Sequence, residues 1–195
     1  LTRNFISSKG EVKKLETPSA KGETNIPFTL ALFLSFASGF IALSYEILWI
    51  RIFSFTEQGR APVFPIVLGF FLVGLAFGSL LAAWLCRKWK QENIRKLIPY
   101  IFFISGIIGF LFPPFVSLLA KGGYEVVAML FVIPMTVILG LSFPLIAHLS
   151  ISPEAEAGVK LSYVYVLNIV GSVLGTLLTG FILSDYLSLA SLSTL

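Results

Sequence analysis

Long apolar segments alternate with short polar segments along the chain. The first apolar run extends from Pro27 to Tyr45 without a charged residue. Because an α-helix rises about 1.5 Å per residue, roughly 20 apolar residues cross the hydrocarbon core of a bilayer. This run therefore predicts a transmembrane helix over residues 26–50.

Four further apolar segments of similar length follow the first. They predict transmembrane helices at 61–85, 97–119, 124–149 and 161–183. Pro134 and Pro144 fall inside the fourth segment, where a missing N–H group should bend or interrupt the helix. The pattern predicts an all-α polytopic transmembrane helix bundle with five complete spans. The closing run YLSLASLSTL predicts the start of a truncated sixth span, so we expect the chain to continue beyond Leu195.

Residues 1–25 differ from the rest of the chain because they are polar and show no sustained apolar period. This composition is typical of a mobile tail, and it lacks the pattern of a signal peptide. The helix bundle is therefore expected to take up residues 26–195.

Composition places the chain among membrane proteins. Hydrophobic residues make up 56% of the chain and charged residues 12%, against roughly 45–50% and 25% in soluble domains. The net charge is +4, but the basic residues lie between apolar segments and form no separate basic domain. A lipid bilayer is therefore the predicted partner, and no nucleic acid is expected.

The distribution of basic residues predicts an orientation. Eleven of the 14 Lys and Arg residues lie in the tail, between the second and third segments, or after the fourth. The other three, on the opposite side, are Arg51, Arg60 and Lys121. Because cytoplasmic loops carry an excess of Lys and Arg, we expect a cytoplasmic N-terminus in an inner or plasma membrane.

A stripe of small and polar residues runs along the first predicted helix. Its members follow the spacing of one helix face: Ser35, Ser38, Gly39, Ala42, Tyr45, Glu46 and Trp49. Serine and glutamate are unfavourable on a lipid-facing surface, so this stripe is expected to face other parts of the protein.

Glu46 is the strongest candidate for function because a carboxylate near the far end of a span requires a partner. One hypothesis is a substrate or proton site formed by Glu46, Tyr45 and Asn168. The alternative is an interfacial carboxylate that pairs with Arg51 or another helix end. For Asn168, a hydrogen bond that joins two helices is the alternative to a substrate contact.

Glycines at helical spacing predict close packing between helices. They are Gly39 in the first span, Gly74 and Gly78 in the second, and Gly171 and Gly175 in the fifth. Small residues let two helix backbones approach each other. Such faces serve either as the moving interface of a transporter or as static packing.

The sequence shows no enzyme site. It contains no G-x-G-x-x-G, Walker A, H-E-x-x-H or C-x-x-C motif, and it has one histidine, His148, and one cysteine, Cys86. We therefore predict no catalytic residues, no metal site and no cofactor within this chain.

Four segments carry a family resemblance: SGFIALSYEILWIR, VLGFFLVGLAFGSLLAA, GLSFPLIAHL and SYVYVLNIVGSVLGTLLTGFIL. Their order resembles the membrane-embedded N-terminal part of fused spermidine-synthase-like membrane proteins, whose spans look like half of a major facilitator transporter. The patterns YE-x-L-W-x-R and LN-x-x-GS-x-x-G are the most specific parts of this resemblance.

The resemblance implies further transmembrane helices and then a C-terminal aminopropyltransferase domain, which makes spermidine from putrescine with decarboxylated S-adenosylmethionine. Residues 1–195 contain no motif of that catalytic domain, so enzymatic activity is left open. The bundle would anchor this domain or handle its polyamine substrate or product. Two alternatives are the first half of a secondary transporter of the major facilitator type and a non-catalytic membrane scaffold.

Overall fold

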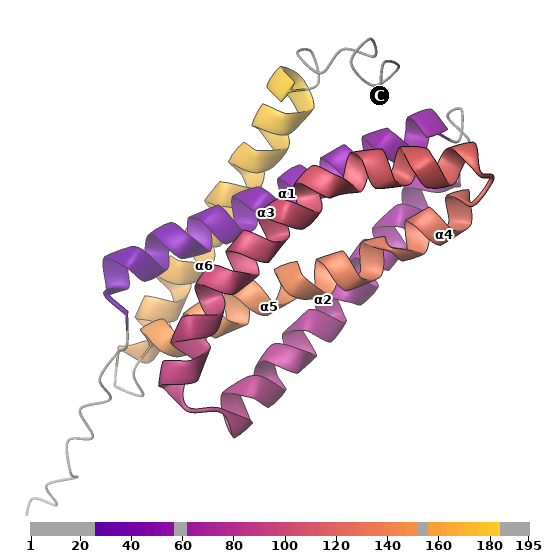
Figure 1. The fold of residues 1–195 in the computed structure, drawn as a ribbon. Helices are drawn as coiled ribbons and strands as arrows, with labels where there is room; N and C mark the ends of the chain where they lie inside the picture. Colours follow the sequence, from indigo (N-terminus) through magenta and orange to yellow (C-terminus); the bar gives the residue numbers. More distant parts are fainter. Residues whose placement is uncertain (1–25, 57–61, 152–155, 184–195) are drawn as a thin grey trace, which may run out of the picture.

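A computed structural model describes residues 26–56, 62–151 and 156–183 of the chain. Within these ranges every element is a helix: α1 (Phe28–Thr56), α2 (Val63–Lys88), α3 (Gln91–Lys121), α4 (Glu125–Leu130), α5 (Val132–Ser150), α6 (Ala157–Leu177) and the short π-helix η1 (Leu178–Leu183). The all-α prediction is thus confirmed (Figure 1). The polar tail and the expected start of a sixth span lie outside the described residues.

Within the described residues, five helical segments are long and apolar enough to cross a bilayer. They are Phe28–Ser54, Val63–Lys88, Gln91–Leu119, Val126–Ser150 and Ala157–Phe181. Their outward surfaces carry large apolar side chains, such as Phe110, which is 81% exposed, and Phe181, which is 72% exposed. A surface of this kind is unfavourable in water and suited to lipid. The protein is therefore an integral membrane protein.

The closest helix pairs join elements that are distant in sequence. α1 packs mainly against α6, and α2 packs mainly against α5. In the first pair, Gly39 lies against Asn168 and Phe40 lies against Gly175. Residue numbers thus increase in the same direction along both helices. α1 and α6 therefore have the same chain direction, and their axes cross at an angle (Figure 1).

Two apolar clusters fill the two ends of the bundle. The first end is where α1 and α3 begin and α2 and α5 end, and its buried core includes Ile26, Ala82, Leu85, Ile94, Ile98, Leu145 and Leu149. The second end holds an aromatic cluster that includes Trp49, Phe53, Phe71, Phe112 and Met129. The ring centroids of Trp49 and Phe112 are 5.4 Å apart. Polar contacts of α1 lie between these two clusters.

The fourth span is divided at Phe131, which lies between the end of α4 at Leu130 and the beginning of α5 at Val132. Pro134 explains this position, because it has no N–H group to donate to the carbonyl of Leu130, four residues earlier. Pro144 lies inside α5 without interrupting it.

Candidate functional site

A reciprocal pair of hydrogen bonds joins α1 to α6. The Ser35 hydroxyl donates to the Val164 carbonyl, and the Asn168 amide donates to the Ser35 carbonyl, each at 3.0 Å. Ser35 is fully buried, and buried polar groups must find partners within the protein. Asn168 therefore serves as a link between two helices at this position.

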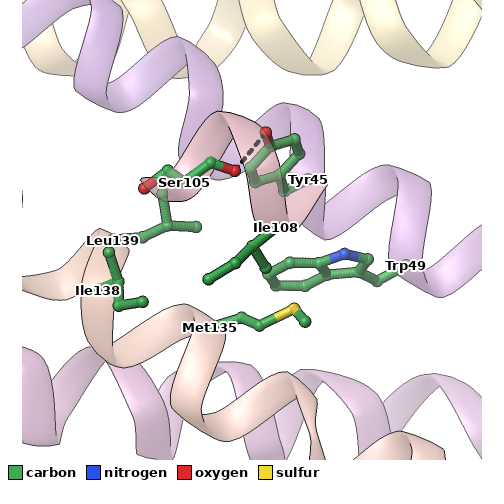
Figure 2. Close-up of a pocket in the computed structure, with 7 residues that line it drawn as sticks. All are labelled: Tyr45, Trp49, Ser105, Ile108, Met135, Ile138 and Leu139. Atoms are coloured by element: carbon green, nitrogen blue, oxygen red, sulfur yellow. Dashed lines mark hydrogen bonds between the residues drawn. The ribbon is translucent and has the colours of Figure 1, made fainter. Parts of the chain in front are cut away.

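Two further hydrogen bonds join α1 to its other neighbours. The hydroxyls of Ser38 and Ser142 share a hydrogen bond between α1 and α5. The Tyr45 hydroxyl donates to the Ser105 carbonyl of α3 at 2.9 Å. Figure 2 shows this second bond at the edge of a pocket that Trp49 and residues of α3 and α5 also line.

The pocket beside Tyr45 is too small for a substrate. It offers about 10 Å³ to the centre of a water molecule, which is roughly the space that one water requires. The rings of Tyr45 and Trp49 lie next to each other, with centroids 5.7 Å apart (Figure 2). This region is therefore closely packed, and it holds at most one water molecule.

The glycines of α1 and α6 lie at backbone contacts between these two helices. A methyl group added at Gly39 would collide with the Asn168 carbonyl, and one added at Gly171 would collide with the Phe36 carbonyl. At Gly175, the carbonyl of Phe40 occupies the corresponding position. Only glycine allows the two helix backbones to come this close, because any Cβ would separate them.

The same arrangement recurs between α2 and α5. A methyl group at Gly74 would collide with the Thr136 side chain, and one at Gly78 would collide with the Val137 carbonyl. Gly140 of α5, which the sequence analysis did not select, packs on Leu75. Gly140 lies four residues after Thr136, and this spacing of small residues could have identified it from the sequence as a packing residue.

Gly109 of α3 is a second contact residue that the sequence analysis missed. A methyl group there would collide with the ring and hydroxyl of Tyr45. Gly109 lies four residues after Ser105, the acceptor of the Tyr45 hydrogen bond. Tyr45 is thus held by a bond and by a tight van der Waals contact, which together fix α3 against α1.

Glu46 lies inside the membrane span. It is five residues from Ile41, the middle residue of Phe28–Ser54, and thus roughly 8 Å from the middle of the span. The sequence predicted that the first span ends at residue 50, but α1 continues to Thr56. Glu46 therefore lies deeper in the membrane span than the sequence predicted. Half of a hydrocarbon core is about 15 Å, so a span centred in the bilayer places this half-buried carboxylate within it.

The described residues provide no salt bridge or hydrogen bond for the Glu46 side chain. The nearby Ser44 lies about 200° around the helix from Glu46, and its hydroxyl packs against Gly175 of α6. α6 therefore passes on the opposite side of α1 at this level. The Ser44 hydroxyl is buried, and it also has no hydrogen-bond partner among the described residues.

The structure does not bring the three residues of the hypothetical substrate site together. Asn168 bonds to Ser35, which is eleven residues before Glu46, a distance of about 16 Å along α1. Tyr45 adjoins Glu46 in sequence, but its hydroxyl is engaged with Ser105 of α3. Of the three, Glu46 is the residue whose side chain makes no hydrogen bond or ion pair within the described residues.

The described residues contain no group of three or more His, Cys, Asp and Glu side chains arranged to hold a metal ion. His148 and Cys86 are each half-buried, at the ends of α5 and α2. They lie in separate helices and do not form a site.

Comparisons with models of protein families, with curated proteins and with solved structures found no match. The resemblance to spermidine-synthase-like membrane proteins therefore rests on the sequence motifs alone.

Proposed function

We propose that the bundle binds an organic cation through Glu46 and serves as the membrane portion of a spermidine-synthase-like fusion. The observation that supports this proposal is the Glu46 carboxylate, which lies within a span and has no partner among the described residues. In this role, the bundle handles the polyamine substrate or product of an aminopropyltransferase domain outside these 195 residues.

The energetic argument concerns the charge of Glu46. A charged side chain at the centre of a membrane helix costs about 2.5–3.5 kcal/mol on insertion scales. Such residues usually pair with another group or line a pathway for ions or substrate. An ammonium group supplies both a compensating charge and hydrogen-bond donors. A polyamine carries several such groups, and one of them would pair with Glu46.

The neighbouring helices support access to Glu46. α5 and α6 make little contact with each other, so they do not close the side of α1 that lies between them. Ser38 faces α5 and Gly39 faces α6 near the middle of the span. At the level of Glu46, α6 passes on the opposite side of α1, and Glu46 lies about 80° from Ser38 around α1. We therefore place the cation beside α5, on the side of α1 that α6 leaves open.

Polyamine flux in cells tests this function. Cells that produce the protein should take up or export labelled spermidine at a different rate from cells that lack it. Glu46→Gln should abolish this difference. Glu92→Gln is the matched control, because Glu92 is an exposed carboxylate paired with Lys96 at 2.8 Å. The same flux in cells with the Glu46→Gln variant, at normal expression, as in cells with the wild type would contradict the proposal.

A non-catalytic membrane scaffold is the second candidate function. It is favoured by the close packing of α1 with α6 and of α2 with α5. Normal membrane insertion without any effect of spermidine on flux or thermal stability would favour the scaffold. Spermidine transport by the bundle without an attached catalytic domain would instead favour a secondary transporter.

A further inference from the structure

A groove lies between the beginnings of α1 and α3 at the first end of the bundle. Its volume is about 540 Å³, and its walls include Ile26, Leu30 and Leu34 on one side and Arg95 and Phe102 on the other. This volume falls within the range of roughly 300–1,000 Å³ that is typical of ligand pockets. The groove is therefore large enough to hold part of a lipid or another small molecule.

The groove runs from the end of the bundle toward the bilayer interior. Arg95 is the fifth residue of α3, so it lies about 6 Å from the beginning of that helix. Phe102 lies seven residues further on, about 10 Å deeper. Leu30 is 43% exposed on the facing wall. A charged group thus stands at the outer end of the groove, and apolar side chains line its deeper part.

The charge around the groove favours an anion. Arg95 is the charged residue among those that line it. Four other exposed basic residues lie nearby in sequence, at the end of α2 and the beginning of α3: Arg87, Lys88, Lys90 and Lys96. The acidic residue in this region, Glu92, forms a salt bridge with Lys96. Within the described residues, the end of α2 and the beginning of α3 therefore carry an excess of positive charge.

We propose that the groove between α1 and α3 binds an anionic phospholipid. Its phosphate would contact Arg95, and one acyl chain would lie along Leu30, Leu34 and Phe102. Guanidinium groups bind phosphate through charge-assisted hydrogen bonds, and basic pockets between membrane helices bind anionic headgroups. This site is separate from Glu46, which lies twelve residues beyond Leu34 in α1, or about 18 Å along the helix.

Lipid retention measured by native mass spectrometry tests the proposal. The full chain is purified into detergent that contains equal amounts of phosphatidylglycerol and phosphatidylcholine. The wild type should retain phosphatidylglycerol preferentially, and Arg95→Gln should lower this preference by about tenfold, which corresponds to about 1.4 kcal/mol. Arg95→Lys, which keeps the charge, should restore part of the preference.

Lys88→Gln is the matched control, because it removes one charge from the same end but outside the groove. It should have a clearly smaller effect than Arg95→Gln. Leu30→Trp fills the groove without changing its charge, and it should lower the retention of both lipids.

Three results would overturn the proposal. The first is a wild type without preference for phosphatidylglycerol. The second is an equal loss in the Arg95→Gln and Lys88→Gln variants, which would indicate diffuse surface charge. The third is a dimer that Leu30→Trp dissociates, because a second copy of the chain would then occupy the groove.

Discussion

The side-chain amide of Asn168 donates a hydrogen bond to the backbone carbonyl of Ser35 at 3.0 Å. Ser35 in turn donates its hydroxyl to Val164, four residues before Asn168 in α6. The two bonds fix the register of the closest helix pair in the bundle. Polar residues of α1 and α6 therefore have a structural role at this level, and Glu46 differs from them.

Asn168→Ala should lower the free energy of unfolding by about 0.6 kcal/mol and by no more than about 1.7 kcal/mol, the average and the maximum measured for hydrogen bonds between membrane helices. Unfolding of the purified protein in mixed detergent micelles measures this change. Ser79→Ala is the control, because the Ser79 hydroxyl is exposed and bonds within its own helix. An equal loss of stability in both variants would contradict the structural role of Asn168.

Gly171→Ala should lower the free energy of unfolding by about 1–3 kcal/mol, because the added methyl group collides with the Phe36 carbonyl and separates two backbones. Gly106→Ala provides the matched control. Gly106 is also within a helix, but a methyl group there meets no atom within 4 Å. Its replacement should leave stability unchanged or raise it by up to about 1 kcal/mol. The reverse order of stabilities would show that α1 and α6 do not pack as described.

Ser44→Ala should raise the free energy of unfolding by about 1 kcal/mol. The Ser44 hydroxyl is buried without a hydrogen-bond partner among the described residues, and removing such a group removes its desolvation penalty. Thermal unfolding compares this variant with Ser35→Ala, which should instead be less stable because Ser35 loses its bond to Val164. A loss of stability in Ser44→Ala would reveal a partner for this hydroxyl.

Tyr45→Phe should lower stability by about 1 kcal/mol, because it removes the hydrogen bond to the Ser105 carbonyl. It should leave spermidine affinity unchanged, since this hydroxyl is engaged with α3. Paired measurements of unfolding and of spermidine binding separate the two effects. A weaker affinity without a change in stability would assign the Tyr45 hydroxyl to the ligand.

The general architecture could be predicted from the sequence because the length of an apolar run determines whether a helix crosses a bilayer. The five spans and the interruption before Pro134 follow from local patterns. The partners of the glycines could not be predicted in this way. Gly39 meets Asn168 and Gly171 meets Phe36 because α1 and α6 run in the same direction, and this pairing depends on contacts between residues more than 100 positions apart.

The composition of the candidate site also depends on long-range geometry. Helical periodicity placed Ser35 and Glu46 on one face of α1, but it did not show which level of that face Asn168 reaches. The hydrogen bond to Ser35 places the side-chain amide of Asn168 at the level of Ser35, which lies about 16 Å along α1 from Glu46. Likewise, Arg95 and Leu30 line one groove only because α1 and α3 begin at the same end of the bundle.

Direct titration of spermidine into the purified full chain tests the role of Glu46 most directly. Wild type and Glu92→Gln should bind spermidine with the same affinity, and Glu46→Gln should bind it at least about tenfold more weakly, since it lacks a charge-assisted hydrogen bond of about 1.5–3 kcal/mol. Equal affinities in all three proteins would contradict a cation site at Glu46.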